Sequence, residues 1–453
     1  QDVWATVLYL IGLAAFIYAC VVGFPPALAQ IQQGIWPGST QGAAGSAPSW
    51  IRLLYPLAVV IVAALVFAMA FFYLMRSYPR QMIKVAYWVS AAYLILFGIF
   101  LLGVRSWIFG GLMILLGLLY ALAYRAMLFK VPFATVMLQL TTSISRQFPA
   151  TQWIGFLATL LTLAFQIVWY IALLGLFNVF YSNSAQPGAT VWVILVFMGK
   201  FFFLYWTQEV VKNTVHVTIA GLYATVYFTG TSTGDALAFH VPVSNPTLKS
   251  ARRALTTSFG SICFGSLLIA IIQTLRFLAR MAQNESAREG NWLLCLLACC
   301  LNCILACLED MLNYFNHYAF TQVAIYGKDY CTAGKDTWNL FLNRGIEAII
   351  NDNLIDNVIL MGGISAGFIG ALVGFLVVFL DSLVASTVES YLLYCIIGFV
   401  LSFSCFMSML RVITSGVSTT FVCLAEDPGT MERLKPELFQ IMAETWPAVQ
   451  WRV

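Results

Sequence analysis

Long apolar runs separated by short polar connections make up most of this chain. Ten runs approach or exceed the roughly 20 residues that a helix needs to cross a bilayer core about 30 Å thick. The runs are continuous and lack the alternation typical of barrel strands, so the pattern predicts ten transmembrane helices. Their expected bounds are 4–28, 51–75, 83–103, 107–124, 152–180, 190–209, 258–279, 291–309, 355–380 and 389–410.

Composition supports a membrane protein. Of the 453 residues, 61% are hydrophobic and only 9% are charged, whereas about 25% are charged in ordinary soluble domains. A soluble globular enzyme, a disordered chain and a nucleic-acid binder are therefore excluded. We expect an all-α polytopic membrane protein surrounded by membrane lipids, with one transmembrane domain over 1–427 and a cytoplasmic tail over 428–453.

The first apolar run has a feature of a signal peptide, because Ala27-Leu28-Ala29 resembles a cleavage site. The run is nevertheless too long for the apolar core of a signal peptide, and no basic segment precedes it. It is therefore predicted to be the first transmembrane helix. The chain begins with Gln1 rather than Met, which indicates that a preceding segment is missing.

Basic residues in the connections predict the orientation in the membrane. The connection 76–84 contains three basic residues and no acidic one, and the connection after the fourth run carries Arg125, Lys130 and Arg146. Connections of this kind face the cytoplasm. The connection 182–190 is uncharged and is expected outside. With ten spans, both termini are then cytoplasmic.

Two further connections are expected on the exterior side. Residues 29–50 are rich in Gly, Ser, Ala and Gln and carry no charge, which is typical of a flexible linker. The connection near Asn284 contains Arg276, Arg280, Arg288 and two glutamates, yet the count of spans places it outside. A glycosylation triplet that starts at Asn284 agrees with an exterior location. The alternative is that the eighth run does not cross completely.

Two polar stretches, 126–148 and 333–350, carry apolar side chains at helical spacing. They predict amphipathic helices at the cytoplasmic interface. A different pattern occurs in the ninth run, where small residues lie three or four positions apart on one face. Such a face allows helices to approach closely. We expect it to pack within one chain, and hence a monomer, rather than to form a dimer seam. These residues are Gly363, Gly367, Gly370 and Gly374.

Ionisable residues inside the runs are the best candidates for function, because each costs at least a few kcal/mol at the bilayer centre unless it is paired or hydrated. Lys200 lies in the sixth run and Glu209 at its end, and the helix is expected to continue beyond residue 209. Aromatic faces with one carboxylate suit an organic cation. A structural pair of Glu209 with Lys200 or Lys212 is the alternative. The candidate substrate-binding residues are Trp169, Trp206, Glu209, Asn213, Tyr223 and Tyr227.

Enzyme motifs and metal-binding patterns are not evident. The sequence contains three histidines and no Walker, HExxH or GxSxG motif, so neither an enzyme nor a cofactor is expected. Cysteines between Cys295 and Cys307 recur at helical spacing. A metal site there is conceivable, but small apolar packing residues are the favoured interpretation.

One segment comprises Asn316-His317-Tyr318-Ala319-Phe320 and the stretch 324–333. It resembles the signature segment of the choline-transporter-like family, and its fungal members most closely. Further similar positions are Gly265-Ser266, Arg276, Cys307-Leu308-Glu309, Trp206 to Glu209 and 421–427, so the resemblance extends from about residue 169 to residue 427. The chain departs from animal members at Ala306, where they tend to have tryptophan, and at 29–50, where they have a large exterior domain.

The resemblance implies a transporter domain of about ten spans in the plasma membrane that moves choline, ethanolamine or another small organic cation. We expect alternating access, with the site between helices near Trp169, Trp206 and Glu209. A membrane organiser that recruits cytosolic partners through the helix at 333–350 is the alternative. An ion channel is disfavoured because neither a ring of charges nor a carbonyl filter motif is evident.

Overall fold

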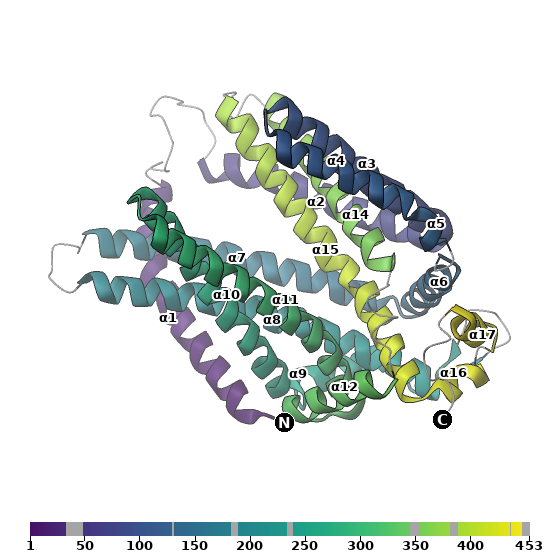
Figure 1. Cartoon of the computed structure of the whole chain (residues 1–453). Helices are drawn as coiled ribbons and strands as arrows, with labels where there is room; N and C mark the ends of the chain where they lie inside the picture. Colours follow the sequence, from purple (N-terminus) through teal and green to yellow (C-terminus); the bar gives the residue numbers. More distant parts are fainter. Residues whose placement is uncertain are drawn as a thin grey trace. The chain divides into compact units, whose positions relative to one another are not determined.

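The computed structural model describes residues 1–32, 49–128, 131–182, 189–232, 239–344, 354–380, 388–434 and 436–445. Almost all of these residues are helical (Figure 1). A short antiparallel pair, β1 (Thr231–Ser232) and β2 (Phe239–His240), is the exception. The helices are α1 (Val3–Gln32), α2 (Ser49–Ser77), α3 (Pro79–Gly103), α4 (Trp107–Leu122), α5 (Tyr124–Met127), α6 (Val131–Gln147), α7 (Ala150–Ser182), α8 (Ala189–Thr229), α9 (Pro246–Leu255), α10 (Phe259–Arg288), α11 (Trp292–Tyr326), α12 (Tyr330–Arg344), α14 (Leu354–Leu380), α15 (Val388–Glu426), α16 (Pro428–Leu434) and α17 (Pro436–Thr445).

Each of the ten predicted spans corresponds to a helix. Nine helices in the described part of the chain are long and apolar enough to cross a membrane. The helix that corresponds to the remaining predicted span, α4, has 16 residues, which gives a length of about 24 Å. This is shorter than the usual core thickness of about 30 Å, so α4 requires local thinning of the bilayer or flanking residues that reach the interface. The prediction of an all-α polytopic membrane protein is confirmed.

The chain forms two compact units. The first comprises Gln1–Trp50, Phe156–Leu222 and Asn245–Asn339, and the second comprises Ile51–Gly155, Tyr223–Ser244 and Leu340–Val453. The long helix α8 contributes to both, because its residues up to Leu222 belong to the first unit and the rest to the second.

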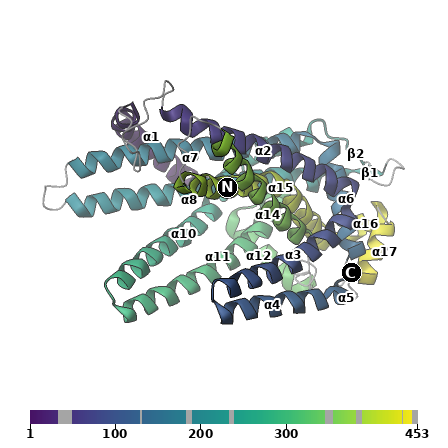
Figure 2. The ribbon, with the colours of Figure 1, turned by 90° about the horizontal axis from the view of Figure 1, so that it is seen from above.

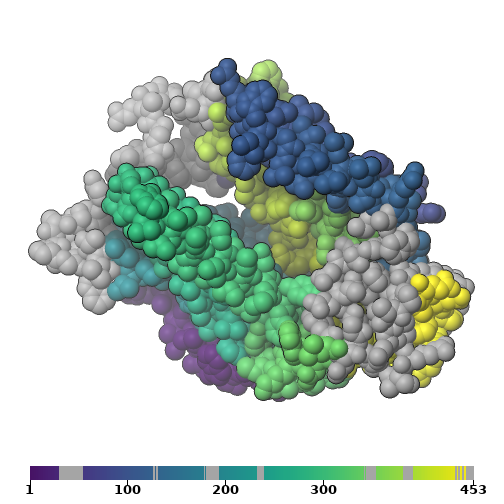
Figure 3. Space-filling view, in the orientation of Figure 1, coloured from purple at the N-terminus to yellow at the C-terminus, as the bar shows by residue number. Residues whose placement is uncertain are grey.

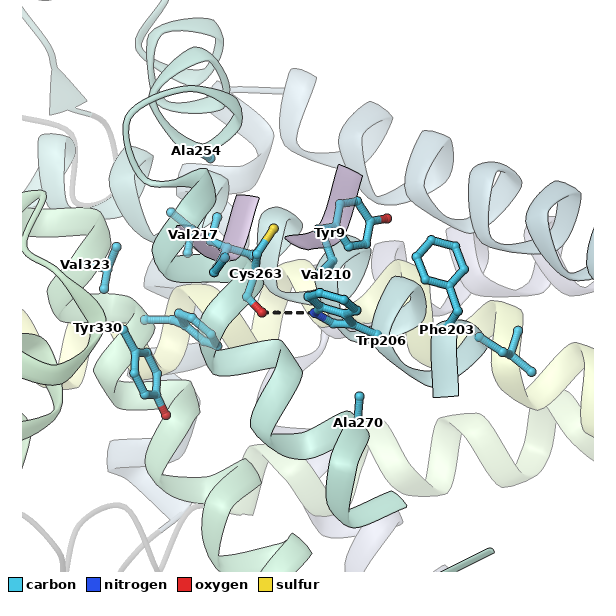
Figure 4. Close-up of a cluster of buried hydrophobic side chains, with 14 of the residues drawn as sticks. Tyr9, Phe203, Trp206, Val210, Val217, Ala254, Cys263, Ala270, Val323 and Tyr330 are labelled. Carbon is cyan, nitrogen blue, oxygen red and sulfur yellow. Dashed lines mark hydrogen bonds between the residues drawn. The ribbon is translucent and has the colours of Figure 1, made fainter. Parts of the chain in front are cut away.

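The first unit is built from α1, most of α7, the first part of α8, and α9 to α11 with the start of α12. Its core is a continuous cluster of apolar and aromatic side chains that these helices share. Tyr9, Phe203 and Trp206 meet at its centre, with the Tyr9 and Trp206 rings edge to face at 5.2 Å (Figure 4). As predicted, α8 continues well past residue 209 and has 41 residues.

Helices α10 and α11 form a long hairpin, visible as two neighbouring ribbons in Figures 1 and 2. Gly290 closes its turn with a φ of +72°, a conformation that glycine adopts without steric cost. The part of α11 after the turn exposes a series of leucines, such as Leu297 at 58%, and Figure 3 shows one face of this hairpin in green. Such an apolar outer surface suits a helix that faces lipid.

In the second unit, the predicted glycine face of the ninth span packs against the tenth span. Gly370 and Gly398 face each other so closely that a Cβ on either would overlap the carbonyl oxygen of the other. A Cβ on Gly367 would lie 2.7 Å from the Phe399 ring. The predicted packing of this face within the chain, between α14 and α15, is therefore confirmed.

The amphipathic stretches differ from the prediction in their surroundings. The first is divided between α5 and α6, and Pro132 occupies the first turn of α6, where its missing N–H costs no helical hydrogen bond. The apolar face of α6 is buried among protein, with Met137 and Leu138 fully covered. It packs against α3 and α15, so the predicted interfacial face is not free to contact lipid.

The second amphipathic stretch corresponds to α12, which exposes 58% of Trp338 and 68% of Leu342. Those two apolar residues lie four positions apart and therefore on one face. The predicted continuation over 345–350 and most of the linker predicted at 29–50 lie outside the described residues. The tail predicted over 428–453 contains α16 and α17 in its described part.

Candidate functional site

Three of the six candidate residues lie along one stripe of α8. Trp206, Glu209 and Asn213 are separated by three and four positions, a spacing that aligns side chains on one helical face. The Trp206 indole N–H donates a hydrogen bond of 3.0 Å to the carbonyl oxygen of Cys263 on α10 (Figure 4). The Asn213 amide donates one of 2.9 Å to the Ser266 hydroxyl. The stripe therefore faces α10.

Glu209 provides a buried negative charge on this stripe. Its side chain is only 8% exposed and forms an ion pair with Lys212, whose side chain is 34% exposed. The Lys212 ammonium donates to both Glu209 carboxylate oxygens, at 3.0 and 3.2 Å, and to the Asn313 side-chain oxygen at 3.2 Å. Three oxygens from α8 and α11 thus surround one primary ammonium. The structural pairing that was the alternative for Glu209 is with Lys212 and not with Lys200.

Trp169 lies in the same unit but nearer the other end of α8. It is 1% exposed, and its indole N–H donates a hydrogen bond of 2.9 Å to the Lys200 carbonyl oxygen. Its ring meets Phe201 edge to face at 5.0 Å. Trp169 therefore fixes α7 to α8 at the level of Lys200.

Tyr223 and Tyr227 belong to the second unit. The Tyr223 hydroxyl donates to the Thr141 carbonyl oxygen on α6 at 2.7 Å, and the Tyr227 hydroxyl donates to the Asp427 carbonyl oxygen at 2.8 Å. Both tyrosines are at least 93% buried. Their polar ends are thus engaged with backbone, and their rings contribute to packing.

The signature segment comes together with α8 and α10. The Asn316 amide donates a hydrogen bond of 3.3 Å to the Gly265 carbonyl oxygen, and its side-chain oxygen accepts one from the Tyr330 hydroxyl. A Cβ on Gly265 would lie 2.5 Å from both the Phe320 and Tyr330 rings. Since Ser266 binds Asn213, residues far apart in the sequence form one buried polar network in the first unit.

Next to this network, His216 of α8 stacks on His317 of α11 with ring centroids 4.0 Å apart. The Nε2 atom of His216 is 2.7 Å from the His317 carbonyl oxygen. A carbonyl oxygen only accepts hydrogen bonds, so this nitrogen carries a hydrogen. The Thr321 hydroxyl lies 3.2 Å from the same nitrogen. These contacts link α8 to α11 about two turns beyond Glu209.

An ion pair between α10 and α11 was not predicted. Arg276 contacts Glu309 through its guanidinium, and the Gln273 amide donates to the other Glu309 oxygen at 3.0 Å. Both charged side chains are at least 80% buried. The signal in the sequence that could have revealed this pair was the presence of opposite charges on the two arms of the predicted hairpin. Arg276 is one of the arginines near the connection that is expected outside. The ion pair neutralises its charge.

The cysteine stripe on α11 is mainly at the surface. Cys300, Cys303 and Cys307 are exposed, whereas Cys295 and Cys299 are partly buried. Packing inside the unit, the favoured interpretation, therefore does not describe the three exposed members. Within the described ranges, no group of three His, Cys, Asp or Glu side chains is arranged to hold a metal ion.

Fold and site together define a polytopic helical membrane protein with a buried carboxylate and a polar network among its spanning helices. Residues 111–429 match the family model described as plasma-membrane choline transporter. Protein PNS1 of Gibberella zeae is 31% identical over 99% of this chain and 83% of its own length. A CTL-like protein of Dictyostelium discoideum is 30% identical over 98% of this chain and 75% of its own length. The chain belongs to the choline transporter-like family.

Similarity also extends to Protein PNS1 of Mycosarcoma maydis, which is 29% identical over 98% of this chain and 82% of its own length. Family membership and the nine long apolar helices support a membrane transporter role for a multi-pass membrane protein.

Proposed function

We propose that this protein carries a small organic cation, such as choline or ethanolamine, across the plasma membrane by alternating access. The observation that carries the proposal is the ammonium site at Glu209. A carboxylate that is 8% exposed already binds the primary ammonium of Lys212, together with Asn313. The cationic group of a substrate has the same charge, so it competes with Lys212 for the Glu209 carboxylate.

Exchange of the two ammonium groups provides a transport cycle. The Lys212 side chain is one-third exposed. It is therefore not held in a fully buried position and can leave the Glu209 carboxylate. Its return neutralises Glu209 after the substrate is released, which avoids the cost of an unpaired charge in a low-dielectric region. A substrate site of this kind near the middle of a bundle, opened to each side in turn, is the general arrangement of secondary transporters.

In this proposal Trp206, Glu209 and Asn213 contact the substrate. A quaternary ammonium donates no conventional hydrogen bond, so choline depends on the Trp206 face and the Glu209 charge. Ethanolamine has a primary ammonium and also hydrogen-bonds to the oxygens that now hold Lys212. Trp169, Tyr223 and Tyr227 have a supporting role, because hydrogen bonds from their polar ends fix α8 to its neighbours.

The test is uptake of labelled choline and labelled ethanolamine by proteoliposomes that contain the purified full chain. Glu209→Gln is expected to reduce uptake at least tenfold, because the amide cannot balance a cation. Glu285→Gln is the matched control, since the Glu285 side chain is 65% exposed and pairs only loosely with Arg288 at 3.9 Å. Trp206→Phe retains an aromatic face and is preferable to Trp206→Ala, which removes a side chain that is only 2% exposed.

Unchanged uptake in the folded Glu209→Gln variant contradicts this site, and absence of uptake of either compound by the wild-type protein contradicts the substrate class. The alternative function as a membrane organiser is favoured by the exposed Trp338 and Leu342 on α12. It predicts inactive proteoliposomes together with capture of a cytosolic partner that is lost in the double variant Trp338→Ser, Leu342→Ser.

A further inference from the structure

A cavity of about 630 Å³ lies between α1, α7 and α8, entirely within the first unit. Its lining is apolar except at one position and includes Gly12, Phe16 and Leu176. On α1 it extends from Leu8 to Val22, which corresponds to about 21 Å along the helix axis. It is therefore an elongated apolar space, as long as one leaflet of a bilayer is thick.

The single charged residue in the lining is Lys200, which is 5% exposed. Its ammonium group has no hydrogen-bond partner among the residues that the structure describes. The ammonium lies over the face of the Phe16 ring, 4.8 Å from its centroid. A cation–π contact offsets only part of the cost of burying an ammonium. The charge therefore calls for an anionic partner.

Three carboxylates of the same unit do not fill this role. Glu209 is bound by Lys212, and Glu309 is bound by Arg276 and Gln273. The Asp2 carboxylate accepts hydrogen bonds from the Ser261 hydroxyl and from the Tyr330 backbone N–H. Each of these acids is thus engaged elsewhere.

The shape of the cavity defines the rest of the ligand. Ile11 and Tyr18 line it and are 61% and 72% exposed, so the cavity opens along α1 to the outside of the unit. A hydrophilic anion gains nothing from the apolar walls, whereas an acyl chain from the surrounding lipid finds an equally apolar environment there. A cation is disfavoured because it meets the Lys200 ammonium.

We propose that this cavity binds an amphiphile with an acyl chain and an anionic head group, whose negative oxygens pair with Lys200. The chain lies along α1, against Phe16 and the α8 side chain Phe202. Trp206 lines the cavity as well as the proposed cation site. The two ligands are nevertheless distinct, because they carry opposite charges and Glu209 lies nine residues beyond Lys200 along α8 with its own partner. A free fatty acid and an anionic phospholipid share the required chemistry.

The experiment measures photo-crosslinking of the purified full chain by three diazirine probes: a 16-carbon fatty acid, the corresponding alcohol, and an anionic phospholipid. Wild type is expected to prefer the acid over the alcohol by about tenfold or more, with crosslinks in α1 or α8. Lys200→Met is expected to remove this preference. Lys249→Met is the matched control, because Lys249 is exposed on α9.

A second variant tests the cavity without changing its charge. Gly199 lines the space, and a Cβ there would have no neighbour within 4 Å, so Gly199→Leu folds and is expected to reduce labelling by the acid. Labelling by the phospholipid but not the fatty acid identifies a lipid head group as the source of the anion, and the converse identifies a free acid. Equal labelling by acid and alcohol, or unchanged labelling of Lys200→Met, overturns the proposal whatever the uptake assay gives.

Discussion

Two asparagine side chains hold together much of the first unit's interior. Asn213 binds Ser266, while Asn316 binds the Gly265 backbone and the Tyr330 hydroxyl. Buried amides are costly unless they are hydrogen-bonded, so each asparagine is effective only when its partner helix is correctly aligned. The signature residues thus specify how α8, α10, α11 and α12 fit together, in addition to any contact with a substrate.

The start of α12 depends on a single carboxylate. Asp329 accepts a hydrogen bond of 3.0 Å from the Thr332 backbone N–H, the third residue of the helix. This is the contact of an N-cap residue. Together with the Thr332 side chain, this bond holds the pKa of the Asp329 carboxyl below its ordinary value of about 3.9.

This lowered pKa makes the first turn of α12 sensitive to acid. Because the folded form binds the proton less readily than the unfolded form, the stabilisation is complete above pH 4 and is lost as pH falls through the pKa of the folded state. Amide hydrogen exchange over 330–333 is expected to become faster in this acidic range. Asp329→Asn keeps the cap and loses the pH dependence. Asp329→Ala loses the cap at every pH, at a cost of about 1 kcal/mol. Equal acid sensitivity in Asp329→Asn would contradict this role.

Among the helices, close backbone contact determines the pairing of α14 with α15. Lipid surrounds both helices, so their association gains little from the hydrophobic effect and depends on dispersion contacts between closely fitting surfaces. Gly370 and Gly398 allow this fit. At Gly362, on the same helix as Gly370, the rings of Phe71 and Phe406 pack against the backbone. A small residue at each crossing point is therefore a requirement of the fold.

Gly370→Leu is expected to separate α14 from α15 and to lower the free energy of unfolding by about 2 kcal/mol or more, because overpacking forces the helices apart. Gly111→Leu is the control in the same unit, since a Cβ at Gly111 has no neighbour within 4 Å. Thermal unfolding of both variants in detergent measures the difference. Similar melting temperatures for the two variants would show that the glycine contact is unimportant.

At the scale of the whole molecule, two ion pairs bear on the topology that the distribution of charge predicts. The hairpin of α10 and α11 carries Arg276, Arg280 and Arg288 towards a turn that is expected outside. Arg276 is paired with Glu309, and Arg288 lies 3.9 Å from Glu285. Pairing lowers the cost of moving this segment across the membrane, so its basic residues are compatible with an exterior location.

The topology predicts that Asn284, which is exposed near the end of α10, becomes glycosylated when the chain is synthesised into microsomes. A glycosylation triplet introduced between α16 and α17, on the cytoplasmic side, is expected to remain unmodified. Asn284→Gln identifies the modified band by its loss. Modification of the introduced triplet would contradict cytoplasmic placement of the C-terminal helices, and an unmodified Asn284 would favour an eighth helix that does not cross.

Much of the fold could be predicted because membrane spans depend on local sequence. Ten apolar runs correspond to ten helices, and the glycine spacing in α14 indicated the face that contacts α15. Only α4 is too short for an ordinary span, since it ends at Leu122. The surroundings of α6 could not be predicted, because an amphipathic pattern identifies an apolar face but not whether lipid or protein covers it.

The candidate site was only partly predictable for the same reason. Trp206, Glu209 and Asn213 are spaced so that a single helix aligns them on one stripe. The pairing of Glu209 with Lys212 was one of several possibilities, and the contact with Asn313 connects positions 101 residues apart. No local pattern reveals such a contact, because it exists only when α8 and α11 lie side by side.

The sequence by itself determined the membrane class, the positions of the ten apolar helices and the signature of the family, because hydrophobic length and side-chain spacing act within a single helix. Only the tertiary structure decided which polar groups are satisfied. It gave Glu209 an ammonium partner and left Lys200 without a hydrogen-bond partner among the described residues, facing an apolar cavity. The physical reason is that the cost of a buried charge depends on the groups that neighbouring helices bring to it.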